Sequence, residues 1–88
     1  MIILIQCTDR IGLVAAISRV LADEGLNITS LREHVDQVEN RFFLRLETPL
    51  HPYIEKLSVG LRQVLPTDAS LTISTGSQKQ IVVMVTKE

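Results

Sequence analysis

The chain has 88 residues, of which 45% are hydrophobic and 22% are charged, and its net charge is −1. This composition indicates one small globular domain, near the lower size limit for folding without cross-links. The balanced charge and an aromatic content of 3% exclude a basic surface with interleaved rings, so we expect no nucleic-acid partner. No apolar run approaches the ~20 residues that cross a bilayer, so we expect no membrane partner either.

The single cysteine, Cys7, cannot form a disulfide within the chain. The N-terminus also lacks a basic segment followed by a long apolar stretch, which is the pattern of a secretory signal. Both observations favour a reducing compartment, and we therefore expect a cytoplasmic protein.

The chain begins with a strand that is followed by an amphipathic helix. Residues 2–5 form an apolar run typical of a strand, and the next apolar residues recur at helical spacing, which predicts a helix over residues 12–24. Gly25 then stands where a left-handed C-terminal cap is favoured. The apolar positions of this helix are Leu13, Val14, Ile17, Val20 and Leu21.

A β-hairpin is predicted next. The second strand should start near residues 27–28 and continue to 35 or 36, with a bulge because Ile28 is out of phase with Leu31 and Val35. Residues 39–40 favour the hairpin turn. The third strand alternates with the period of a half-buried strand and should direct Phe42, Leu44 and Leu46 to the core.

A second helix and a fourth strand follow the prolines at positions 49 and 52. The helix carries one apolar stripe, contains Gly60 at a mild local cost, and ends at Pro66. The strand alternates Ala69, Leu71 and Ile73 with polar residues. The stripe consists of Ile54, Leu57, Leu61, Val64 and Leu65.

The order of elements is βαββαβ, which predicts an α+β, ferredoxin-like fold. Right-handed crossovers would place both helices on one face of a four-stranded antiparallel sheet. The other face would be open, with Phe43 on it beside charged neighbours. That side chain is either an ordinary exposed aromatic or a modest docking point.

The C-terminal run, residues 81–85, does not fit this pattern because it is continuously apolar, as in a strand buried on both faces. We therefore predict one domain over residues 1–76, and a linker with the first strand of a truncated second domain over 77–88. The alternative is an extra edge strand, formed within this domain or across a dimer.

The turn between the first strand and helix, residues 8–12, is a candidate anion site. Backbone N–H groups and the positive end of the helix dipole would meet there, and Gly12 would allow a ligand to approach the main chain. The alternative is that Thr8 or Asp9 simply caps the helix.

No catalytic constellation is evident, and we expect no catalytic residue, metal ion or cofactor. Cys7 has no histidine nearby in the sequence to act as a base, so it is predicted to be a packed thiol. His34 and Asp36 share one face of a strand, but two ligands are too few for a metal site. His51 is predicted to lie at the start of the second helix.

The sequence resembles a known family of domains and, within it, one narrower group of proteins. Residues 7–18, followed by Asn27 and Ile28, resemble the pattern of ACT domains, which are small βαββαβ regulatory modules that bind amino acids. Residues 34–36, 40–45 and the tail 79–88 resemble the N-terminal domain of bacterial formyltetrahydrofolate deformylases and the start of their hydrolase domain. One departure is Thr8, which stands where these proteins usually have proline.

The resemblance implies a regulatory role for a chain that is itself catalytically inert. The parent enzyme would hydrolyse formyltetrahydrofolate to formate and tetrahydrofolate, feeding purine synthesis, with its catalytic residues beyond Glu88. The chain would form a homodimer through the ACT domain and bind a small amino acid, glycine or methionine, at the interface. The alternative is a stand-alone ACT interaction module or part of a glycine-responsive tandem-ACT repressor.

The resemblance also implies the residues of the amino-acid site. Backbone N–H groups of Gly12, Leu13 and Val14 would hold the ligand carboxylate, while Asp9 and Asn27 would hold the ammonium or shape the loop. The complete predicted set is Asp9, Arg10, Gly12, Leu13, Val14, Asn27 and Ile28.

Overall fold

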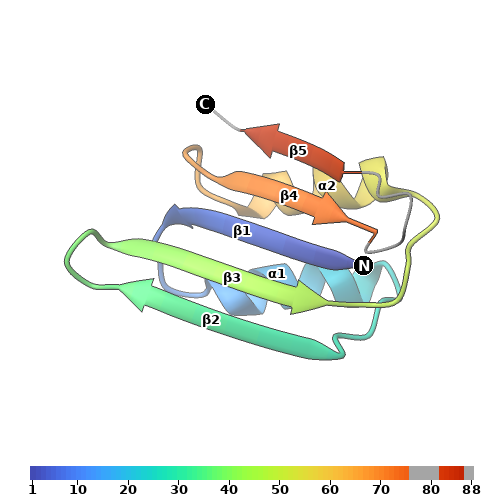
Figure 1. The fold of residues 1–88 in the computed structure, drawn as a ribbon, viewed down its shortest axis with the longest axis horizontal. Coiled ribbons are helices and arrows are strands. Elements are labelled where there is room, and N and C mark those ends of the chain that lie inside the picture. Colours follow the sequence, from blue (N-terminus) through green and yellow to red (C-terminus); the bar gives the residue numbers. More distant parts are fainter. Residues whose placement is uncertain (76–81, 87–88) are drawn as a thin grey trace.

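A computed structural model describes residues 1–75 and the backbone of residues 82–86. The predicted βαββαβ order is confirmed, and a fifth strand follows it (Figure 1). The elements are β1 (Ile2–Thr8), α1 (Leu13–Asp23), β2 (Ser30–Asp36), β3 (Arg41–Glu47), α2 (Ile54–Val64), β4 (Ser70–Ser74) and β5 (Val82–Thr86).

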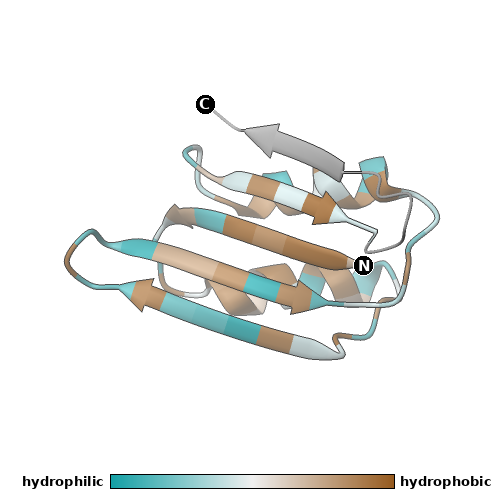
Figure 2. Cartoon of the chain, viewed as in Figure 1, coloured by the Kyte–Doolittle hydropathy of each residue, from teal (hydrophilic) through white to brown (hydrophobic). Residues whose placement is uncertain are grey.

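All strands pair antiparallel with their neighbours, in the order β2-β3-β1-β4-β5. Both helices lie behind the same face of the sheet, and the opposite face is open, as the sequence predicted (Figure 1). The first strand is central and the most continuously apolar, whereas β2 at one edge is largely hydrophilic (Figure 2). Burial follows the same trend, because alternate residues of β1 are buried whereas most residues of β2 are exposed.

The core lies between the sheet and the two helices. Alternate residues of β1, β3 and β4 are buried in it, so the predicted core positions of β3 and β4 are confirmed, and Phe42 is only 2% exposed. Leu13, Ile17 and Leu21 supply the buried stripe of α1. Leu57 and Leu61 do the same for α2. This shared core fixes the start of α1 against β1 and β3.

The start of β2 was predicted wrongly. The strand begins at Ser30, and its register with β3 runs from Ser30 opposite Glu47 to Asp36 opposite Arg41 without an inserted residue. Ile28 therefore lies in the connection from α1 and not in the strand, which explains why it is out of phase with Leu31. The predicted bulge is not formed.

Gly60 has a packing role that the sequence did not reveal. A Cβ atom at this position would lie 3.2 Å from Cγ1 of Val20 on α1, which is tighter than ordinary van der Waals contact. The glycine thus lets the two helices approach each other closely, which offsets its cost in helix propensity.

The fifth strand pairs with β4, with Ser70 opposite Thr86 and Ser74 opposite Val82. The apolar run near the C-terminus therefore supplies an edge strand of this sheet. The predicted linker, residues 77–81, and residues 87–88 lie outside the described residues. The division into two domains stays a prediction.

Candidate functional site

The turn between β1 and α1 exposes the start of a helix. Gly12 is the N-cap with φ of 87°, a left-handed conformation that glycine adopts without strain. The first intrahelical bond runs from the N–H of Ala16 to the carbonyl of Gly12, over 2.9 Å. The N–H groups of Leu13 and Val14 therefore have no acceptor within α1.

The side chains of Thr8 and Asp9 do not cap α1, so the alternative interpretation of the turn is wrong. No side-chain hydrogen bond caps this helix within the described part of the chain. The hydroxyl of Thr8 instead donates to Oδ2 of Asp68 over 2.7 Å. Because the capping position falls on Gly12, which has no side chain, the first amides of α1 stay available to a ligand.

A hollow of about 280 Å³ lies beside these amides. It contains every predicted site residue of the turn, together with three side chains from the neighbouring strands β2 and β3. The lining residues are Asp9, Arg10, Ile11, Gly12, Leu13, Val14, Ala15, Glu33, Val35 and Phe42. The structure thus gathers the predicted turn residues around one cavity.

Asn27 and Ile28 do not line this hollow. They follow the C-terminal end of α1, an 11-residue helix about 16 Å long, whereas the hollow lies at its N-terminal end. Asn27 is exposed and Ile28 packs partly against the core. Within one copy of the chain, these two predicted residues are separated from the rest of the site.

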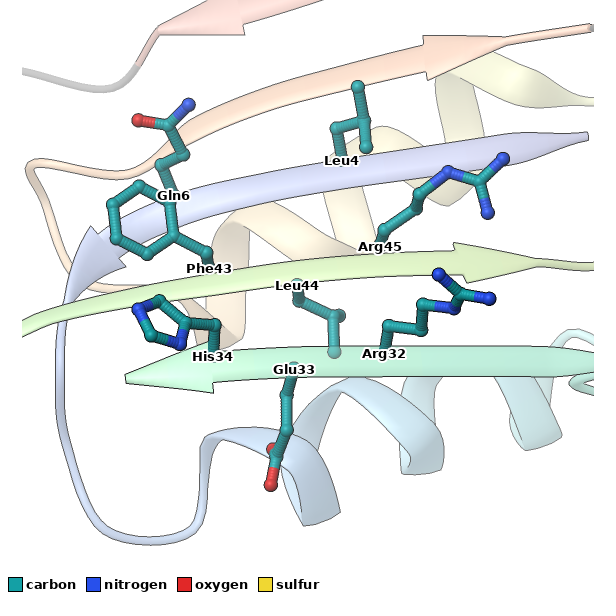
Figure 3. A pocket seen from close by; sticks show the side chains of 8 residues that line it. All are labelled: Leu4, Gln6, Arg32, Glu33, His34, Phe43, Leu44 and Arg45. Carbon is teal, nitrogen blue, oxygen red and sulfur yellow. The ribbon is translucent and has the colours of Figure 1, made fainter. Parts of the chain in front are cut away.

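Glu33 is the site residue that the sequence analysis missed. It shares the core-facing side of β2 with Leu31 and Val35, and its side chain points toward the layer that contains α1 (Figure 3). The detectable signal was a charged residue in the apolar phase of a strand. Its carboxylate adds a second acidic group to the hollow, beside Asp9.

Asp68 holds the end of β1 from the side of β4. Its Oδ2 accepts hydrogen bonds from the N–H of Thr8 (2.9 Å), the hydroxyl of Thr8 (2.7 Å) and Nη1 of Arg41 (2.6 Å). The hydroxyl of Thr8 first, and the guanidinium of Arg41 after it, hold the pKa of the Asp68 carboxyl below its ordinary value of 3.8. This cluster fixes the residue from which the turn departs.

Two further hydrogen bonds anchor the turn itself. The N–H of Asp9 donates to the carbonyl of Asn40 over 2.8 Å, and Nη2 of Arg10 donates to the carbonyl of Val64 over 2.6 Å. Val64 is the last residue of α2, so Arg10 places a cation at the negative end of that helix. Arg10 therefore joins the turn to α2, with its guanidinium engaged by the protein.

Cys7 is a packed thiol, as predicted. It is 0% exposed, and burial is the main cause that raises its pKa from 9.0 to about 11. Because a thiol must ionise to act as a nucleophile, this environment opposes reactivity.

His51 lies at the start of α2, as predicted, and its ring is 7% exposed. Nδ1 accepts the N–H of the N-cap residue Tyr53 over 2.8 Å, which leaves Nε2 to donate to Oε1 of Glu24 over 3.1 Å. The ring thus joins the start of α2 to the end of α1 and has a structural role.

His34 and Asp36 do not form a metal site with other residues. Among the described residues, no three His, Cys, Asp or Glu side chains gather where they could hold an ion. Asp36 accepts hydrogen bonds from the N–H groups of Val38 (3.0 Å) and Glu39 (3.2 Å) and so shapes the hairpin turn.

In the part of the chain that is described, no helix has the length and apolar character needed to span a membrane.

Comparison with known proteins identifies the family. The sequence pattern of the ACT domain matches residues 1–51. The chain belongs to the ACT domain family. This agrees with the strand order and with the turn described above.

The sequence relatives include formyltetrahydrofolate deformylases. The protein of this name from Escherichia coli K12 is 33% identical over 82 residues, covering 93% of this chain and 29% of the relative. The one from Haemophilus influenzae is 33% identical over 87 residues, covering 99% of this chain and 31% of the relative. This ACT chain thus spans less than a third of these relatives.

Solved structures share the fold. A formyltetrahydrofolate deformylase from Pseudomonas putida KT2440 matches with a TM-score of 0.68 and 20% identity, over 80% of this chain and 26% of that one. One from Pseudomonas syringae matches with a TM-score of 0.65 and 21% identity, over 94% of this chain and 26% of that one. The predicted resemblance is therefore confirmed at the level of sequence family and fold.

Proposed function

We propose that this chain is the regulatory ACT domain of a formyltetrahydrofolate deformylase and that it binds a small amino acid at the β1–α1 turn. The observation that carries the proposal is the hollow of about 280 Å³ beside uncapped amides of α1. The name of these relatives indicates the enzyme, whose expected activity is the release of formate. The single buried thiol suits the reducing cytoplasm that we expect for it.

The hollow suits a zwitterion because it offers opposite charges at separate places. The N–H groups of Leu13 and Val14, at the positive end of the α1 dipole, would hold the carboxylate. The carboxylates of Asp9 and Glu33 would accept the ammonium group. Val35 offers an apolar wall to a side chain such as that of methionine.

A second copy would complete the site. Asn27 and Ile28 lie too far from the hollow within one chain, so they reach the ligand only if another copy brings them there. Binding at the interface of an ACT homodimer, which the family resemblance implies, meets this requirement. A ligand that binds two packings of the pair with different affinity would then bias the attached hydrolase domains.

Calorimetry with glycine and methionine tests the binding. We expect saturable heat from at least one of them, and we expect Glu33→Gln to weaken the affinity about tenfold, since a charge-assisted bond is lost. Glu55→Gln, on the exposed side of α2, is the matched control and should leave the affinity unchanged. A folded dimer that gives no heat at millimolar ligand would remove the amino-acid role and leave dimerisation alone.

The alternative is a stand-alone ACT module or part of a tandem-ACT repressor. The observation that favours it is the pairing of β5 with β4, because the C-terminal apolar run then belongs to this sheet. Sequencing the gene beyond codon 88 discriminates the two. A hydrolase domain supports our proposal, and a second ACT domain supports the alternative. The chain alone should release no formate from formyltetrahydrofolate.

A further inference from the structure

The open face of the sheet carries two arginines directly opposite each other. Arg32 on β2 is the register partner of Arg45 on β3, and Leu4 on β1 is the next partner in the same row. Like charges at directly opposed positions of a sheet are unfavourable. Nη1 of Arg45 contacts Oε2 of Glu47 at 3.2 Å.

Two rings form the adjacent row. His34 is the register partner of Phe43, and their ring centroids are 6.0 Å apart with an interplanar angle of 32°. Gln6 completes the row on β1. The rings lie at one end of the exposed face and the arginine side chains extend away from them in a common direction (Figure 3).

A hollow of about 250 Å³ lies over these two rows, and Leu4, which is 43% exposed, lies in its lining. The size is slightly below the ~300 Å³ at which ordinary ligand pockets begin, so it favours a single-ring ligand. Rows two residues apart on a strand are separated by about 7 Å, which is the length of a ring plus an acidic substituent.

We infer that this face binds a small planar anion, a single ring that carries a phosphate or carboxylate group. The ring stacks on Phe43 and His34, and the acidic group bridges the guanidinium groups of Arg32 and Arg45. The bridge replaces the repulsion between the arginines with two charge-assisted contacts. The same charges oppose a face-to-face contact between two copies, because such a contact opposes like charge with like charge.

The two hollows share one lining residue, Glu33, whose side chain points toward the helix layer (Figure 3). Arg32, Phe43 and Arg45 line only the hollow on the open face of the sheet. Substitutions at these three positions therefore test this inference without removing a group from the amino-acid hollow.

A titration followed by NMR of the isotope-labelled chain tests this inference. Two combined probes, phenyl phosphate and 4-aminobenzoate, carry both a ring and an anionic group. Two half probes carry one feature each: inorganic phosphate has only the anion, and benzamide has only the ring. We expect the amide signals of Arg32, Phe43 and Arg45 to shift with at least one combined probe. Its affinity should be at least about tenfold above that of either half. The tighter of the two combined probes shows whether a phosphate ester or a carboxylic acid is the natural class.

Three variants locate the binding. Arg32→Gln should weaken it about tenfold and Phe43→Leu, which keeps apolar bulk but removes the flat ring, by a similar factor. Arg19→Gln is the matched control, since Arg19 lies on α1 with its side chain 82% exposed. The inference is overturned if the combined probes bind no tighter than their halves, or if Arg19→Gln weakens binding as much as Arg32→Gln.

Discussion

Replacing Asp68 with alanine should destabilise the chain and loosen the turn that carries the proposed amino-acid site. The substitution removes three hydrogen bonds, two to Thr8 and one to Arg41. Each such bond contributes about 0.5–1.5 kcal/mol, and an exposed ion pair contributes at most about 1 kcal/mol. Because the carboxyl side chain is 39% exposed, values at the low end apply, and we expect a total loss of about 1–3 kcal/mol.

Urea denaturation of Asp68→Ala against the parent chain measures this loss. For a domain of this size, each kcal/mol also lowers Tm by about 4–8 °C. Asp23→Ala is the matched control, because Asp23 is 69% exposed and its contact with Arg19 spans 3.8 Å. That variant should change stability by no more than about 0.5 kcal/mol. Equal losses for both variants would refute the role of Asp68.

The stability difference between the parent chain and Asp68→Ala should depend on pH. The folded state lowers the pKa of the Asp68 carboxyl below 3.8, so its contribution is fully present above that value and is lost as the pH falls through the folded pKa. The stability difference between parent and Asp68→Ala should therefore be constant near neutral pH and shrink in acid. A difference that does not change below pH 3.8 would contradict the assigned cause.

The thiol of Cys7 should resist thiol reagents in the folded chain and react only on unfolding. The free energy of unfolding should fall as the pH rises from 9.0 toward 11, because the thiol ionises in the unfolded chain before it does in the folded one. Rapid native labelling, followed by mass spectrometry, would contradict this. Gly12→Ala should cost about 1–2 kcal/mol in thermal denaturation because φ is 87°. A neutral result would mean that the turn adopts another backbone. His51→Ala should cost about 1–3 kcal/mol, since it removes the hydrogen bonds to Oε1 of Glu24 and to the Tyr53 amide. A loss below that of the exposed His34→Ala would refute this role.

Periodicity predicted most of the fold because β1, β3, β4 and both helices each bury one face. The alternation of Phe42, Leu44 and Leu46 and the helical spacing of Leu57 and Leu61 placed these residues in the core correctly. The start of β2 was not predictable in the same way. Ile28 is apolar and packs partly against the core, so its apolar character does not show whether it lies in the strand or in the connection before it.

The candidate site was predictable where it depends on the local chain and not where it depends on distant contacts. The turn and the role of Gly12 were predictable because the apolar pattern changes there from that of a strand to that of a helix. The anchoring of Thr8 by Asp68 joins residues 60 positions apart, and no local pattern specifies that pair. Glu33 enters the hollow through the register of β2 with β3, which sequence alone did not fix.

The most direct test of the proposed amino-acid site is an NMR titration of the isotope-labelled chain with glycine and with methionine. The account predicts saturable shifts of the Leu13 and Val14 amides, together with Gly12, for at least one of the two ligands. An affinity from these shifts that is about tenfold weaker in Glu33→Gln, with the fold intact, would support the proposed ammonium contact. Shifts confined to other elements, or none at millimolar ligand in the folded protein, would contradict the account.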